Sequence, residues 1–126
     1  MKRRDQRIKI MNCLYQYLLT EKTIEDIFDD NLDVDDKKSI SFIVETTVNT
    51  IENMEELQKE IIENLTPDWQ WDRLGYIERA LLLMGAYEIR HTETDKPVII
   101  NEIVEISKVY CDEEASGLLN VVLDKL

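Results

Sequence analysis

The protein has 126 residues, with 27 acidic and 15 basic side chains and a formal net charge of −12 at pH 7. The length suits one domain with a sizeable hydrophobic core, and the negative charge disfavours non-specific binding to nucleic acid. Cys13 and Cys111 are isolated and His91 is the only histidine, so we predict no disulfide framework, no metal site and no cofactor.

The first helix is predicted over residues 3–20, where apolar residues from Ile8 to Leu19 recur at intervals of three and four. Residues 1–9 hold five basic side chains against Asp5, a local charge of +4. Cations are unfavourable at a helix N-terminus, because the helix dipole favours anions there. The cluster therefore favours an anionic partner, and an ordinary solvated N-terminus is the alternative.

A short second helix is predicted around residues 24–28, with Thr23 as its N-cap. Residues 29–35 are interpreted as an acidic loop, and they lack the Gly and distal Glu of a calcium-binding loop. A third helix is predicted to start at Asp35 or Asp36. Its apolar spacing continues to Leu65, with a break near residue 53.

The central helix is predicted over residues 73–90, because apolar side chains cover almost its whole circumference. We expect the other helices to pack around it, and we expect Trp69 and Trp71 to bury their rings at its start. A further helix follows Pro97, with Tyr110 expected to face inward.

The last helix is predicted to begin at an Asp112 N-cap. Its apolar residues, among them Leu118, are expected to bury one of its faces. Together the patterns predict an all-α fold of six or seven helices around a central buried helix, with no strands.

Three stretches in fixed order resemble the NusB transcription antitermination family. They are Arg3-Arg4-x-x-Arg7 with Leu14-Tyr15-Gln16, then Ile77-Glu78-Arg79-Ala80 with Gly85-Ala86-Tyr87-Glu88, and finally Ile100-Asn101-Glu102 with Asn120-x-x-Leu123-Asp124-Lys125. The resemblance implies a NusB-like fold of two small helical subdomains, which we take as residues 1–66 and 67–126 of a single domain. It also implies a non-enzymatic RNA-binding factor that binds boxA RNA of ribosomal RNA transcripts together with NusE, in an antitermination complex on RNA polymerase.

The resemblance also implies the site residues. The expected RNA contacts are Lys2, Arg3, Arg4, Arg7, Tyr15, Glu114, Leu118 and Asn120, and the expected NusE contact is Glu78. Leu118 stands where many family members have an aromatic residue, and Val121 stands where they have Gly. The missing aromatic at Leu118 removes a stacking surface for RNA, and Val121 suggests tighter helix packing in place of a close backbone approach.

Alternatives stay open for several of these residues. Tyr15 equally suits core packing, Glu78 a solvated or ion-paired acid, and Asn120 a structural hydrogen bond, while Asn101 and Glu102 favour a capping or inter-helix role. The alternative function is a helical protein-interaction adaptor or homodimer with weakened RNA binding. An enzyme is disfavoured, because no nucleophile–base pair or Gly-rich phosphate loop is present. Without a signal peptide or membrane-spanning run, we expect a cytoplasmic protein.

Overall fold

The computed structural model describes residues 1–33 and 40–126, and these residues are helical with no strand. The helices are α1 (Arg3–Leu19), α2 (Ile24–Asn31), α3 (Ile40–Glu52), α4 (Met54–Glu63), α5 (Tyr76–His91), α6 (Lys96–Tyr110) and α7 (Glu113–Lys125), with a 3-10 turn at Trp71–Arg73 before α5. The prediction of an all-α fold is confirmed. The predicted start of the third helix at Asp35 or Asp36 lies outside the described residues.

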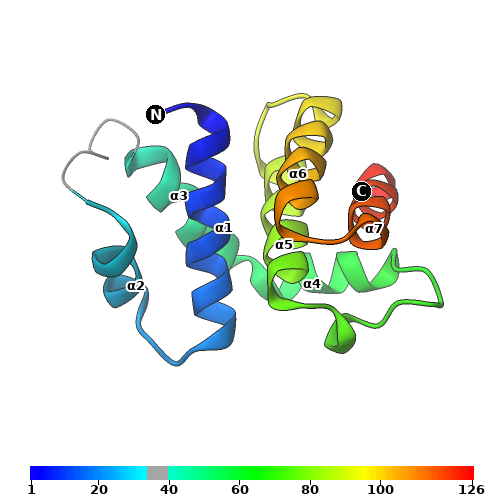
Figure 1. Cartoon of the computed structure of the whole chain (residues 1–126), viewed down its shortest axis with the longest axis horizontal. Helices are drawn as coiled ribbons and strands as arrows, with labels where there is room; N and C mark the ends of the chain where they lie inside the picture. The colour runs from blue at the N-terminus through cyan, green and yellow to red at the C-terminus, as the bar shows by residue number, and fades with distance from the viewer. Residues whose placement is uncertain (34–39) are drawn as a thin grey trace.

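Helix α5 lies at the centre of the fold and packs against α1, α3, α4, α6 and α7 (Figure 1). Every residue from Ala80 to Glu88 is buried, as the apolar circumference predicted. Helices α2 and α3 pack on α1, and α7 packs on α6, so α5 joins both groups of helices. The division into residues 1–66 and 67–126 stays a prediction.

Short sequence signals mark the starts of α2 and α7 and the break between α3 and α4. The hydroxyl of Thr23 accepts a hydrogen bond from the backbone N–H of Asp26 at 3.2 Å, and a carboxylate oxygen of Asp112 accepts one from the N–H of Ala115 at 2.8 Å. Both predicted N-caps are therefore confirmed. The predicted break is also confirmed, because Asn53 separates α3 from α4.

Two boundaries differ from the prediction. Helix α2 continues to Asn31, so the first acids of the predicted loop are helical. Helix α5 begins at Tyr76 rather than residue 73, because Leu74 and Gly75 are extended, with ψ of 146° and 159°. The periodic pattern did not reveal this interruption, since the apolar Leu74 keeps helical spacing and is buried.

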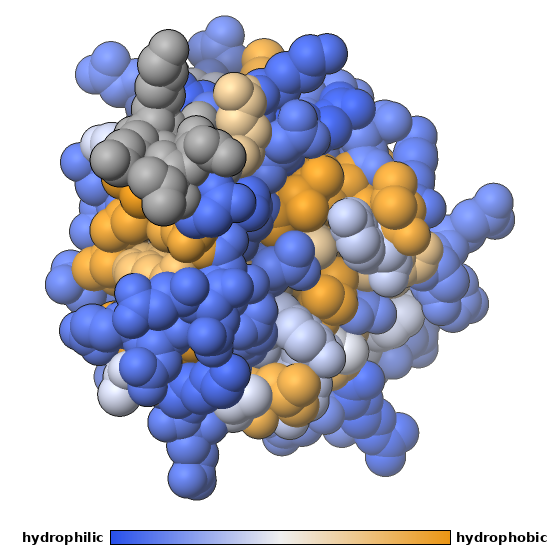
Figure 2. Space-filling view, turned by 60° about the vertical axis from the view of Figure 1, so that its left-hand side comes forward, coloured by the Kyte–Doolittle hydropathy of each residue, from blue (hydrophilic) through white to orange (hydrophobic). Residues whose placement is uncertain are grey.

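The outer faces are polar. On the side where α1 and α2 come forward, Figure 2 shows apolar groups as separate areas within a mainly hydrophilic surface. Tyr110 was predicted to face inward, and this was wrong, because it is exposed at the end of α6. Leu19, the last residue of the apolar pattern in the first helix, is likewise exposed at the end of α1. No helix in residues 1–33 or 40–126 is both long and apolar enough to span a membrane.

Candidate nucleic-acid interface

The N-terminus of α1 forms an exposed basic tip that consists of Lys2, Arg3 and Arg4. A shallow groove separates this tip from the start of α6, and Thr94 and Val98 line its far side. The basic tip lies here because α1 runs antiparallel to α5 and its first turn projects beside the N-terminal end of α6 (Figure 1).

Arg3 is held in place without a carboxylate partner among the described residues. Its Nη1 donates a hydrogen bond to Oε1 of Gln6 at 2.9 Å, and its guanidinium carbon lies 3.9 Å from the centroid of the Phe42 ring. A guanidinium stacked on an aromatic ring keeps its full positive charge and several free donors. Arg3 therefore presents an oriented cation to the solvent.

Arg4 forms a bidentate salt bridge to Glu102 of α6. Nε and Nη2 donate to the two carboxylate oxygens at 2.8 and 3.1 Å. These hydrogen bonds raise the pKa of Arg4 and lower the pKa of Glu102. The two side chains are 47% and 21% exposed, so the bridge is open to competition from another anion. The bridge also confirms the inter-helix role expected for Glu102.

Arg7 is enclosed in the α1–α5 interface. Its Nε and Nη2 donate to Oε2 and Oε1 of Glu88 at 2.9 and 2.8 Å, and the two side chains are only 6% and 1% exposed. Burial alone would lower the pKa of Arg7, but the hydrogen bonds and charge of Glu88 outweigh it and raise that pKa. The RNA contact expected for Arg7 stays a prediction, and it would require this buried pair to open.

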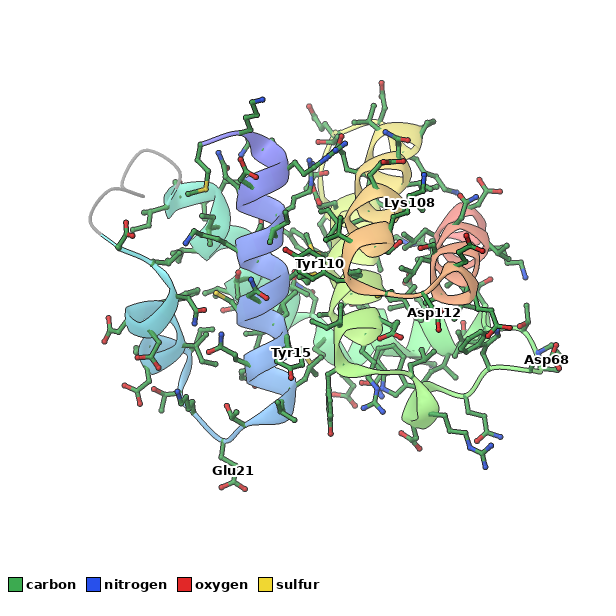
Figure 3. All side chains as sticks on the ribbon, in the orientation of Figure 1. Tyr15, Glu21, Asp68, Lys108, Tyr110 and Asp112 are labelled. Atoms are coloured by element: carbon green, nitrogen blue, oxygen red, sulfur yellow. The ribbon has the colours of Figure 1, made fainter. Side chains whose placement is uncertain are left out.

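Tyr15 lies about three turns beyond Arg4 along α1, on the seam with α5. Its ring meets that of Tyr76 edge-on, with centroids 6.4 Å apart and planes at 76°. Figure 3 shows Tyr15 and Tyr110 over this same seam. Tyr15 is half-buried, so part of its ring reaches the surface and part packs on the fold.

Glu78, the expected NusE contact, lies in the first turn of α5. Its carboxylate folds back over the N-cap, where a Cβ on Gly75 would clash with it. The charge of Glu78 also affects the thiol of Cys111, which lies between α6 and α7. Burial, together with the negative charges of Glu78 and Asp112, raises the pKa of Cys111 to about 12.

The three expected α7 residues have different surroundings. Glu114 is exposed in the first turn, whereas Leu118 is only 5% exposed and belongs to the hydrophobic core. Asn120 is exposed and lines a separate groove between α6 and α7, together with Asn101. Val121 was interpreted as tightening helix packing, and this is wrong because 45% of its surface is exposed.

Sequence reasoning missed four residues that shape these surfaces: Phe42, Tyr76, Arg79 and Glu88. One signal could have revealed Glu88. An acid within the apolar stretch of α5 from Ala80 to Ile89 is buried only with a partner, and Arg7 lies on the apolar side of α1. Phe42 and Tyr76 carried no such signal, because their importance depends on which helices become neighbours.

Within residues 1–33 and 40–126, no cluster of three or more His, Cys, Asp or Glu side chains has the arrangement of a metal site. Cys13 is fully buried, which raises its pKa to about 11, and His91 stacks on Tyr87 with ring centroids 5.3 Å apart. Cys13 is therefore packed into the core, whereas His91 is exposed at the C-terminal end of α5.

Comparisons with known proteins agree with this architecture. Residues 4–126 match the NusB family model. A transcription antitermination protein NusB from Sulfurovum sp. (strain NBC37-1) is 39% identical over 98% of this chain and 96% of its own, and one from Exiguobacterium sp. (strain ATCC BAA-1283 / AT1b) is 35% identical over 100% and 97%.

Solved structures give the same result. T. maritima NusB superimposes with a TM-score of 0.88 at 27% identity, covering 99% of this chain and 89% of its own. A chain in a crystal structure of the antitermination factors NusB and NusE in complex with dsRNA gives a TM-score of 0.82 at 26% identity, covering 98% and 93%.

Proposed function

The chain belongs to the NusB family, and we propose that it is a non-enzymatic RNA-binding transcription antitermination factor. In this proposal it binds the boxA element of ribosomal RNA transcripts together with NusE, within an antitermination complex on RNA polymerase. The similar chain found with NusE and RNA supports both classes of partner.

The observation that carries the proposal is the exposed basic tip on an otherwise acidic protein. Lys2, Arg3 and Arg4 are the basic side chains of this tip, and two of them are oriented, by Phe42 and by Glu102. Guanidinium groups suit RNA because they present a planar fork to phosphate and stack on bases. The net charge of −12 repels the rest of an RNA strand and confines it to this end.

The Arg4–Glu102 bridge does not prevent RNA binding. Exposed salt bridges contribute only about 0–1 kcal/mol, so a phosphate can replace the carboxylate at little cost. Arg7 has a different role in this proposal: its buried pair with Glu88 fixes α1 on α5, which positions the basic tip.

The other expected contact residues differ in their exposure, and we propose different roles for the exposed and the buried ones. Tyr15 and Glu114 reach the surface and are proposed to border the RNA, and Asn120 would contact it only along the α6–α7 groove. We assign Leu118 a packing role instead of a contact. Glu78 is proposed to meet a basic side chain of NusE, because an acid at this position complements a basic ribosomal protein.

The test is a fluorescence titration of a boxA-type RNA, with and without purified NusE, over a series of salt concentrations. Three phosphate contacts on a single strand give a log–log salt slope of about −2. Arg3→Ala should weaken binding and flatten the slope by about 0.7, while Lys22→Ala, at an exposed cation paired with Asp30, should change neither. Failure of the wild-type chain to bind RNA in both conditions would overturn the proposal.

Glu102→Gln provides a second arm of the same titration. The substitution removes the anion that competes for Arg4 and keeps a side chain of similar size. We expect RNA binding several times tighter than that of the wild-type chain. Unchanged or weaker binding would contradict the proposed role of Arg4.

A second candidate function is a helical adaptor or homodimer with weakened RNA binding. Two observations favour it: Arg4 and Arg7 already have carboxylate partners, and Leu118 is buried instead of offering a stacking surface. Capture of NusE without RNA binding would support the adaptor, and sedimentation equilibrium would detect the dimer.

A further inference from the structure

The seam between α1 and α5 has a different chemistry at each end. At one end Arg7 pairs with Glu88, and at the other Tyr15 meets Tyr76. The residue numbers rise along α1 as they fall along α5, so the two helices run antiparallel and the seam leads from the basic tip to an aromatic pair. The proposed function uses Arg7 at the first end and Tyr15 at the other, and it leaves Tyr76 without a role.

Tyr76 is an exposed aromatic side chain held by its neighbours. It is the first residue of α5, and 38% of its surface is accessible. The guanidinium carbon of Arg79 lies 5.0 Å from the centroid of its ring and 5.7 Å from that of the buried Trp71. Tyr15 contacts the ring of Tyr76 edge-on.

Arg79 is itself fixed by the backbone. Its Nε donates to the carbonyl oxygen of Leu74 at 3.1 Å, and its Nη2 donates to that of Asp72 at 2.8 Å. Both carbonyls belong to the turn that precedes α5, so this turn and the first turn of the helix lock together. The result is a row of planar groups, from Trp71 through Arg79 to Tyr76, that continues to Tyr15.

We propose that Tyr76 is a base-stacking residue of the RNA site, held in position by Tyr15 and Arg79. The inference rests on the proposed function, and it adds a specific contact at the far end of the seam. Single-stranded RNA is bound by aromatic rings that stack on bases beside cations that follow the phosphates. Tyr76 supplies the ring here, and Arg79 supplies the adjacent cation.

The distance from the basic tip to Tyr15 and Tyr76 matches the length of a few nucleotides of one RNA strand. Arg4 and Tyr15 are eleven residues apart on α1, which is about 16 Å at 1.5 Å per residue. At 3.4 Å per stacked nucleotide, this distance corresponds to about five nucleotides. A strand whose phosphates contact the basic tip therefore reaches Tyr76 within a short RNA element.

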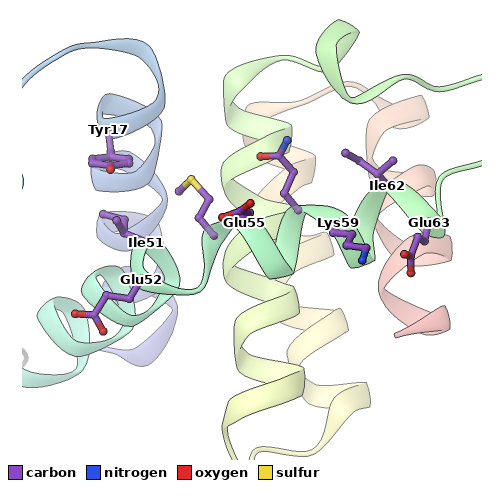
Figure 4. A pocket seen from close by; sticks show the side chains of 9 residues that line it. Tyr17, Ile51, Glu52, Glu55, Lys59, Ile62 and Glu63 are labelled. Atoms are coloured by element: carbon purple, nitrogen blue, oxygen red, sulfur yellow. The ribbon is translucent and has the colours of Figure 1, made fainter.

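The experiment compares four full-length chains in the boxA-type RNA titration: wild type, Tyr76→Ala, Tyr76→Phe and Tyr17→Ala. Tyr17 is the matched control, because it is 36% exposed, close to the 38% of Tyr76, but lies on α1 at a different groove. Ile51 and Ile62 also line that groove (Figure 4). Tyr76→Phe keeps the ring and removes only the hydroxyl. Thermal melting of each variant establishes that it is folded.

We expect Tyr76→Ala to weaken RNA binding by about 5- to 100-fold, which is about 1–3 kcal/mol at 1.4 kcal/mol per tenfold. The salt slope should stay that of the wild type, because stacking releases no counterions. Tyr76→Phe and Tyr17→Ala should bind like the wild type. A purely structural role for Tyr76 would instead lower the melting temperature, with a smaller effect on affinity.

Three outcomes would overturn the inference. One is wild-type affinity in a folded Tyr76→Ala chain; another is an equal loss in the Tyr17 control; the third is a loss in Tyr76→Phe as large as in Tyr76→Ala. In each of these the wild-type chain still binds RNA, so the proposed function survives. Absence of binding by the wild-type chain overturns the proposed function and this inference with it.

Discussion

Arg7→Ala should destabilise the fold far more than Arg4→Ala, although both residues form bidentate salt bridges from α1. The substitution at Arg7 removes the partner of Glu88, whose side chain is 1% exposed, and leaves a carboxylate in the core without its cation. Breaking a buried pair in this way costs about 3–5 kcal/mol. The Arg4 bridge to Glu102 is open to solvent, which screens it, so its loss should change the stability little.

The difference is large on the scale of protein stability. Domains unfold with a total free energy of about 5–15 kcal/mol, so Arg7→Ala removes a large fraction of the stability of a typical domain. At about 2 cal/mol/K of unfolding entropy per residue, a chain of 126 residues loses roughly 4 °C of melting temperature per kcal/mol. We therefore expect a fall of about 10–20 °C for Arg7→Ala.

The assay is urea and thermal unfolding, followed by circular dichroism, of the wild-type chain and both variants. The double variant Arg7→Met/Glu88→Leu is a useful third arm, because replacing a buried ion pair by apolar residues of similar size is often neutral or stabilising. A recovery of stability in the double variant would identify the orphaned carboxylate as the cause. Equal losses in Arg7→Ala and Arg4→Ala would refute the reasoning from burial.

Three further predictions concern the stability of the fold. Gly85→Ala should destabilise by about 1–2 kcal/mol in chemical denaturation, because its new Cβ would lie 3.0 Å from the buried methyl carbons of Leu123. Gly117→Ala should instead stabilise by about 0.5–1 kcal/mol, because it lies inside α7 with no atom within 4 Å of the new Cβ. Burial raises the pKa of Cys13 from 9.0 to about 11, so this thiol favours the folded state below pH 9, and its contribution should be lost as the pH rises toward 11. Unfolding curves of the wild type and Cys13→Ala at pH 8 and 11 should therefore diverge in the alkaline range.

The features that sequence predicted are those encoded within one or two helical turns. The N-caps at Thr23 and Asp112, the break at Asn53 and the all-round apolar pattern of the central helix depend only on neighbouring residues. For Leu118 the two kinds of sequence evidence differed: apolar periodicity predicted burial, and family resemblance implied an RNA contact. The structure agrees with the periodicity.

The features that sequence missed depend on which helices pack together. Arg7 and Glu88 are 81 residues apart, so a local pattern can indicate that each needs a partner but not that the two pair with each other. The contact of Arg3 with the Phe42 ring is likewise not encoded in the sequence of α1, because Phe42 belongs to α3. Exposure at helix ends was also missed, as at Tyr110, because periodicity gives the direction of a side chain but not where its neighbours stop.

The arginines of the first helix show how burial separates two roles within one motif. Arg3 and Arg7 are four residues apart and share a helix face, so both guanidinium groups lie over Phe42, at 3.9 and 5.8 Å. Arg7 is one turn further into the fold, where α5 encloses it and supplies Glu88. Arg3 stays at the open end with its charge available. Loss of RNA binding in an Arg7 variant would therefore be no evidence of a phosphate contact, since α1 carries the whole basic tip and α1 is fixed to α5 by that pair.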